Sequence, residues 1–138
     1  MVVRVGLIGV GNIASMFVQS IYFYRRYGYV EGAIHDSIDK LSIGDIDVVY
    51  AIDVSKYKVG RDLGEAIFAP PNLVPRLVDI DKTGVIVRMG CVLDGVAQHM
   101  VSDFHPLEMP EPSFDELVEE IREAGVDVLV NLLPVGSA

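Results

Sequence analysis

One stretch near the start of the chain decides the fold: Val5-Gly6-Leu7-Ile8-Gly9-Val10-Gly11-Asn12-Ile13-Ala14. It leads from an apolar run through a glycine-rich turn into a segment with helical periodicity. The run covers residues 1–9, is rich in β-branched side chains and is interrupted only at Arg4, which is typical of a central strand in a parallel sheet. Residues 12–26 repeat apolar side chains at spacings of three and four, which predicts a helix. The stretch thus predicts a strand, a tight turn and a helix in direct succession.

Further strands and helices alternate along the rest of the chain. A second apolar run over residues 46–52 ends in Asp53 and predicts a second strand. Ser113 and Glu116 have the spacing of a capping box and begin a helix that Gly125 ends. The other predicted elements are a helix or broken helix over 56–68 that stops before Pro70 and Pro71, a short third strand over 85–87, a weaker helical segment over 94–102 and a last strand over 126–133.

This alternation sets the fold class. Strands that alternate with helices form βαβ units, and βαβ units give a parallel sheet with right-handed crossovers. The chain is therefore predicted to be an α/β protein with a Rossmann-like, doubly wound parallel sheet that is incomplete, with about four strands. Its 138 residues suffice for one domain, so we expect residues 1–138 to form a single unit.

The glycine-rich turn carries the strongest chemical signal. Gly9 allows a tight turn, Gly11 has no side chain to keep a pyrophosphate from the backbone, and Ala14 lets the helix pack closely on the strand. The unpaired N–H groups and the dipole at the start of the helix favour an anion there. The pattern therefore predicts a dinucleotide contact over Gly9, Val10, Gly11, Asn12 and Ile13. The alternative is a strand–helix turn that binds nothing.

The dinucleotide fingerprint also requires an acid at the end of the second strand, where it binds the adenosine ribose. Asp53 stands there, but it comes 42 residues after Gly11 (53 − 11), against roughly 20 in the simple version. An insertion over residues 25–45 accounts for the excess. A carboxylate at this place repels a 2′-phosphate, so NAD is favoured over NADP.

Other polar residues give weaker signals. Asp94 precedes Gly95 in a turn after the third strand, where it either faces the cofactor or simply forms the turn. The lysines at 40, 56, 58 and 82 do not stand in apolar settings that would lower their pKa. Lys56 and Lys58 follow soon after Asp53 and are expected to be solvated, with a role in binding phosphate as the alternative. His35, His99 and His105 lack the spacing of metal ligands, so no metal site is expected.

Composition excludes several classes of protein. Twenty acidic against eleven basic residues give a net charge of −9, which argues against binding to nucleic acid. The single cysteine, Cys91, excludes an internal disulfide and a thiolate zinc cluster. There is neither a run of about 18 apolar residues nor a secretion signal, so we expect no membrane association and a cytoplasmic location.

Several segments together resemble a known family. They are Val5 to Ser15, Ala51-Ile52-Asp53-Val54, Lys58-Val59-Gly60-Arg61-Asp62-Leu63, Ala66-Ile67-Phe68-Ala69, Val92-Leu93-Asp94-Gly95 and Val126 to Ser137. In this order they resemble the amino-terminal part of myo-inositol-1-phosphate synthase in its short prokaryotic form. The Val-Gly-x-Asp-Leu block and the closing Leu-Pro-Val-Gly-Ser are more specific to that family than the glycine turn, which many dehydrogenases share.

The resemblance implies an NAD-dependent isomerisation. In that family NAD oxidises C5 of glucose 6-phosphate to a ketone, an enolate closes the ring by an intramolecular aldol attack, and the hydride is then returned. By position, Gly9 to Ile13 would hold the pyrophosphate and Asp53 the adenosine ribose. Leu133 and Pro134, at the carboxyl end of the last strand, would pass near the cofactor.

The chain also departs from the family pattern, because family members continue well past Gly136-Ser137. The part beyond carries the lysines and aspartates that bind sugar phosphate and move protons, so no residue here is assigned a catalytic role. We expect no synthase activity without a complementing catalytic chain, and self-association through an incomplete sheet. The alternatives are a non-catalytic NAD(H)-binding module and a sugar dehydrogenase of the glucose-fructose oxidoreductase type, whose Glu-Lys-Pro segment does not occur here.

Overall fold

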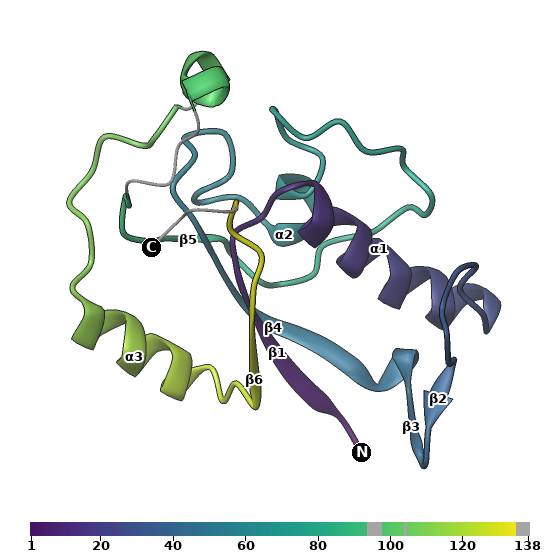
Figure 1. The fold of residues 1–138 in the computed structure, drawn as a ribbon. Helices are drawn as coiled ribbons and strands as arrows, with labels where there is room; N and C mark the ends of the chain where they lie inside the picture. The colour runs from purple at the N-terminus through teal and green to yellow at the C-terminus, as the bar shows by residue number, and fades with distance from the viewer. Residues whose placement is uncertain (94–97, 104, 135–138) are drawn as a thin grey trace.

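The computed structural model describes residues 1–93, 98–103 and 105–134, and within them four parallel strands form the central sheet (Figure 1). The strand order is β5–β4–β1–β6. In chain order this is third, second, first, fourth, which matches the first four strands of the Rossmann order 3-2-1-4-5-6. The predicted α/β, Rossmann-like class is confirmed. The strands are β1 (Val3–Ile8), β4 (Ile46–Asp53), β5 (Arg88–Met89) and β6 (Val128–Asn131).

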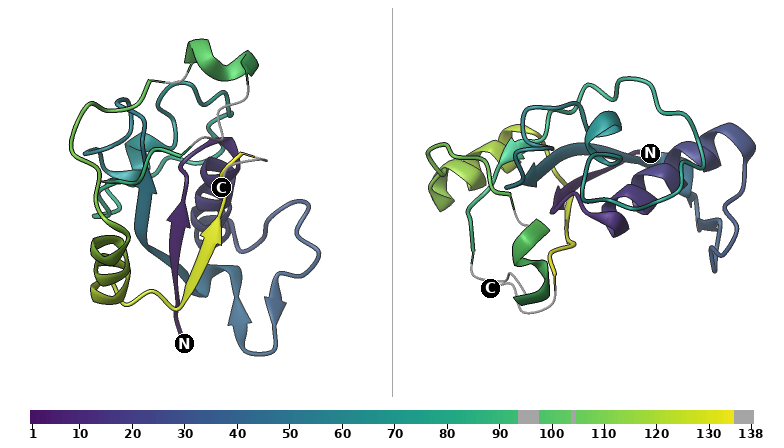
Figure 2. Two further views of the ribbon diagram at one scale, coloured as in Figure 1. Left: turned by 60° about the vertical axis from the view of Figure 1, so that its left-hand side comes forward. Right: turned by 90° about the horizontal axis from the view of Figure 1, so that it is seen from above.

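Two helices cover opposite faces of this sheet, α1 (Asn12–Tyr27) and α3 (Phe114–Glu123) (Figures 1 and 2). Successive residues of a strand point to opposite faces, so each strand contributes to both layers. On β4, Ala51 packs into the larger core with α1, whereas Tyr50 and Ile52 pack with Leu117 of α3. This separation into two apolar layers explains why the strands read as continuous apolar runs rather than alternating ones.

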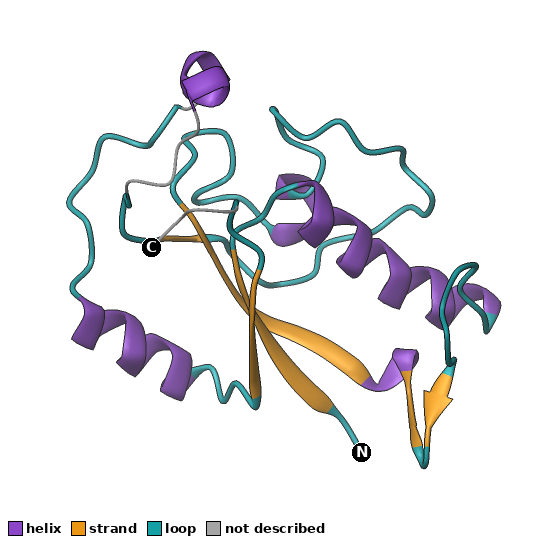
Figure 3. Ribbon diagram, viewed as in Figure 1, coloured by secondary structure: helices purple, strands orange, loops and turns teal. Residues whose placement is uncertain are grey.

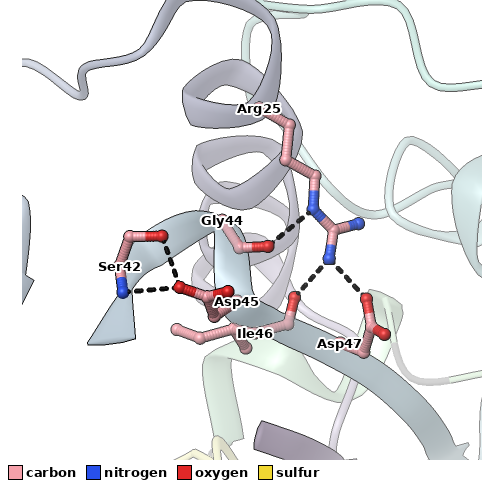
Figure 4. A network of polar contacts seen from close by, with 6 residues as sticks. All are labelled: Arg25, Ser42, Gly44, Asp45, Ile46 and Asp47. Carbon is pink, nitrogen blue, oxygen red and sulfur yellow. Dashed lines mark hydrogen bonds and ion pairs between the residues drawn. The ribbon is translucent and has the colours of Figure 1, made fainter. Parts of the chain in front are cut away.

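Residues 28–45, most of the predicted insertion, connect α1 to β4 and contain a small antiparallel pair of strands. Its strands are β2 (Ser37–Ile38) and β3 (Leu41–Ser42), followed by a 3-10 turn, η1 (Ile43–Asp45). Arg25 of α1 fastens the returning chain (Figure 4): its guanidinium donates to the carbonyl oxygens of Gly44 at 3.0 Å and Ile46 at 2.8 Å and pairs with Asp47. The entry into β4 is thereby fixed to the last turn of α1.

Most of the described chain between β4 and α3 is loop, and the predicted helix or broken helix over 56–68 is formed only in part (Figure 3). Only Leu63–Ala66 form an α-helix, α2. Gly60 takes a left-handed φ of +83°, which breaks the helical path, and Asp62 begins a new helix as its N-cap. The weaker helical segment predicted over 94–102 is partly represented by a 3-10 helix, η2 (Gln98–Asp103), while residues 94–97 lie outside the described ranges.

The third strand lies three residues later than predicted, at Arg88–Met89 instead of 85–87. Residues 85–87 run antiparallel to residues 60–63 and do not join the sheet. Asp62 causes this placement, because its carboxylate accepts hydrogen bonds from the amides of Thr83 and Gly84 at 3.0 and 2.8 Å. The Asp62 carboxylate also accepts a hydrogen bond from the Thr83 hydroxyl at 2.9 Å, which further attaches this segment to Asp62.

The carboxyl-terminal unit agrees with the sequence pattern. Ser113 Oγ accepts from the Glu116 amide at 3.2 Å, and the Glu116 carboxylate accepts from the Ser113 amide at 2.7 Å, so the capping box is confirmed. Gly125 has a φ of +66° just after α3. The last strand is shorter than 126–133, because the Val126 amide still bonds to the Ile121 carbonyl of α3.

Gly6 of β1 pairs with Leu129 of β6. A β-carbon on Gly6 would lie 2.8 Å from Leu129 Cδ2, so a larger residue would displace the end of the Leu129 side chain. The β1–β4 register also shifts between Val5 and Gly6.

Candidate functional site

The glycine turn lies at the carboxyl end of β1, at the point where the sheet continues in opposite directions to β4 and to β6. Gly9 has a φ of +92°, and a β-carbon there would lie 3.3 Å from the Leu132 carbonyl oxygen. Its amide donates to the Ile52 carbonyl at 2.9 Å. Gly9 therefore shapes the turn, as predicted, through a conformation and a close approach that other residues do not tolerate.

The space beside the α-carbon of Gly11 is open. A β-carbon on it would meet nothing within 4 Å, and its φ of −88° is ordinary. It is the N-cap of α1, which has no side-chain cap and no acidic residue in its first turn. The N–H groups at the start of this 16-residue helix are therefore available to an anion, which the helix dipole favours.

Asp53 ends β4, as the sequence predicted, and it lies against this turn. Its Oδ2 accepts a hydrogen bond from the Val10 amide at 2.8 Å. Its Oδ1 accepts from the amides of Val54 and Ser55, both at 2.8 Å. A carboxylate has about four acceptor positions, so Oδ2 retains capacity for one more donor, such as a ribose hydroxyl. The structure thus brings together the two parts of the fingerprint despite their separation in sequence.

The other predicted site residues take different places. The Val10 side chain is fully buried and its amide is bound to Asp53, so the donors available to a ligand begin at Gly11. Asn12 Oδ1 accepts from the Leu73 amide at 2.8 Å, while Ile13 is exposed. Leu133 lies beside the turn, since its Cδ2 would be 3.3 Å from a β-carbon on Gly9. Pro134 follows it and is exposed, and Asp94 lies outside the described residues.

The expectation that Lys58 is solvated was wrong. Its side chain is 4% exposed, and its Nζ donates to the Val10 carbonyl at 2.7 Å and to Asn72 Oδ1 at 2.9 Å. Burial lowers the pKa of Lys58, and the charge of Asp53 partly offsets this. Neither Lys58 nor Asn72 has a recognisable sequence signal, because the loops of 54–112 bring them under the turn. Lys56, two positions away, is exposed as expected.

Among the residues that the structure describes, no helix combines the length and apolarity needed to cross a bilayer. No three of the His, Cys, Asp or Glu side chains of these residues gather closely enough to hold a metal ion. The expected absence of a metal site stays a prediction.

The fold and the glycine turn define an α/β chain of the Rossmann type with a dinucleotide fingerprint. Its sequence relatives are inositol-3-phosphate synthases, which confirms the predicted resemblance. The proteins of this name from Mycolicibacterium smegmatis, Mycobacterium tuberculosis and Corynebacterium glutamicum are 39%, 38% and 36% identical to it over 98% of the chain. The chain spans 37% of the length of each. A scan of protein-family models finds no match.

Two solved structures share the fold. The crystal structure of Ari2 superimposes with a TM-score of 0.76 at 27% identity and covers 97% of this chain and 38% of its own. A myo-inositol-1-phosphate synthase-related protein from Thermotoga maritima superimposes with a TM-score of 0.65 at 22% identity, over 96% of this chain and 34% of its own. The second likeness concerns the fold alone.

Proposed function

We propose that this chain binds NAD(H) at the glycine turn. The hydrogen bond from the Val10 amide to Asp53 Oδ2 carries the proposal, because it fixes the ribose-binding carboxylate beside the anion-binding start of α1. In this arrangement the amides from Gly11 onward receive the pyrophosphate, and the remaining acceptor position of Asp53 receives a ribose hydroxyl.

The same carboxylate favours NAD over NADP. A 2′-phosphate would stand on the hydroxyl that Asp53 accepts from, and two negative groups would then meet at hydrogen-bond distance. Lys56 is exposed nearby in sequence, but Lys58 is buried under the turn and does not reach outward to neutralise such a phosphate.

For the whole protein we propose the reaction of the synthases it resembles, conversion of glucose 6-phosphate to an inositol phosphate. Bound NAD supplies the transient oxidation of a sugar carbon. The residues of this chain hold and orient the cofactor, and the sugar-phosphate site comes from a complementing part. The support is the identity of 36–39% to inositol-3-phosphate synthases together with a span of 37% of their length.

Calorimetric titration with NAD and with NADP tests the binding proposal. NAD is expected to bind and NADP to bind at least tenfold more weakly, as one tenfold step corresponds to about 1.4 kcal/mol. Absence of heat with both nucleotides would refute the proposal. A turnover assay with glucose 6-phosphate, NAD and a complementing catalytic chain tests the reaction. NAD binding without turnover in that mixture would favour a non-catalytic NAD(H)-binding module.

A further inference from the structure

Charged side chains bind both backbone groups of Val10, its N–H and its carbonyl. Its N–H donates to the Asp53 carboxylate at 2.8 Å, and its carbonyl accepts from the Lys58 ammonium at 2.7 Å. Asn72 Nδ2 donates to the same carbonyl at 3.2 Å and to the Ile67 carbonyl at 2.9 Å. Two donors, one of them charged, therefore converge on one backbone oxygen at the centre of the glycine turn.

The direction of this carbonyl determines the direction of the next amide. The Val10 carbonyl and the Gly11 N–H belong to one planar trans peptide unit, in which the C=O and N–H bonds point in opposite directions. Lys58 lies on the buried side of the turn and draws the carbonyl inward. The Gly11 N–H consequently points away from Lys58. Gly11 also leaves its surroundings open, since a β-carbon on it would meet nothing within 4 Å.

The positive charge of Lys58 also favours an anion at the start of α1. A cation with 4% of its side chain exposed is poorly screened by water, so its attraction reaches an anion at the start of α1 more effectively than a surface charge does. Exposed Lys56 has no comparable contact with the turn.

We propose that Lys58 is a positioning residue for the dinucleotide phosphates: its bond to the Val10 carbonyl aims the Gly11 N–H at the pyrophosphate, and its buried charge attracts that anion. This inference rests on the proposed NAD binding. In this proposal Lys58 acts through the turn, since its ammonium is bound to the Val10 carbonyl and to Asn72 Oδ1.

The test compares the wild type with Lys58→Met and with Lys56→Met as the matched control. Methionine has a similar length but neither donor nor charge. Each protein is titrated with NAD and, by NMR, with adenosine, which has the ribose hydroxyls but no phosphate. We expect Lys58→Met to weaken NAD binding about tenfold or more while adenosine binding is unchanged. Lys56→Met should match the wild type with both ligands.

The outcomes separate this inference from the proposed function. If the wild type binds no NAD, the proposed function fails and this inference with it. If the wild type binds NAD and Lys58→Met binds it equally well, only the positioning role is overturned. Equal weakening of NAD and adenosine would show a structural role and overturn it too. If Lys58→Met does not melt cooperatively, Asn72→Ala takes its place, with a smaller phosphate-specific loss expected and equal affinity for NAD as the contrary result.

Discussion

The Asp53 Oδ2 atom lies 2.8 Å from the Val10 amide nitrogen, so the end of the second long strand is bonded directly to the turn that follows the first. The sheet brings these residues together because β1 and β4 are parallel neighbours, with Ile8 opposite Ile52. Their junction combines a structural hydrogen bond with the carboxylate that we propose to bind the ribose.

Asp53→Asn is expected to weaken both functions of that group. The asparagine amide nitrogen faces N–H donors where the carboxylate accepted them, so a hydrogen bond to Val10 or to the 54–55 backbone is lost. The free energy of unfolding should fall by about 1–3 kcal/mol. NAD affinity should fall about tenfold, and preference over NADP should narrow. Denaturant melts and calorimetry measure these changes.

Exposed Asp79→Asn is the control, and it should leave stability and nucleotide affinity as they are in the wild type. Unchanged selectivity in Asp53→Asn would mean that Asp53 does not face the ribose.

Gly11→Val separates binding from folding. Its β-carbon meets nothing within 4 Å and its φ of −88° suits any residue, so the melting temperature should change little. The side chain would occupy the place of the pyrophosphate, and NAD binding should be abolished. Calorimetry and thermal melts measure the two effects. Retained NAD affinity would contradict the assigned turn.

Gly9→Ala should lower the stability of the fold, whereas Gly11→Val should leave it nearly unchanged. Its φ of +92° and the contact of 3.3 Å with the Leu132 carbonyl oxygen make a side chain unfavourable. The free energy of unfolding should fall by about 1–3 kcal/mol even without ligand. A variant as stable as the wild type would refute the strain argument.

Asp62 should make stability depend on acid pH. Burial by itself raises the pKa of Asp62, but hydrogen bonds from Thr83, Gly64 and Gly84 outweigh it and hold the pKa below 3.8. A carboxyl group with a depressed pKa stabilises the fold above its unfolded pKa, and this contribution is lost as pH falls through the folded value. Asp62→Asn should therefore be less stable than the wild type at pH 6, with a gap that narrows below pH 3.8. Urea melts across this range test it, and a constant gap would be the contrary result.

Self-association is expected through β6. Within the described residues β6 is an edge strand, and it exposes 47% of Val128 and 44% of Leu129. Open backbone and apolar side chains at a sheet edge favour pairing with another chain. Sedimentation should show species larger than the monomer, and Val128→Lys should shift them toward monomer. A wild type that remains monomeric at high concentration would contradict this proposal.

Sequence reasoning succeeded where local pattern determines structure. The β1–turn–α1 unit, the strand that ends in Asp53 and the capped helix α3 follow from apolar periodicity, glycine placement and the capping box. It failed where tertiary contacts compete with the pattern. Residues 85–87 have strand character but bind residues 60–63 because Asp62 attaches Thr83 and Gly84. The burial of Lys58 likewise depends on a loop that carries no periodic signal.

The missing side chain of Gly6 leaves room for the Leu129 side chain beside β1. A methyl group introduced at residue 6 would meet Leu129 Cδ2 at 2.8 Å, and the end of that leucine side chain would have to turn aside. Leu129 is 44% exposed on a strand that is at the edge of the described sheet, so its displaced end would move toward solvent. The effect of Gly6→Ala would therefore fall on the apolar surface of β6 and not on the strand spacing, which the ladder hydrogen bonds set.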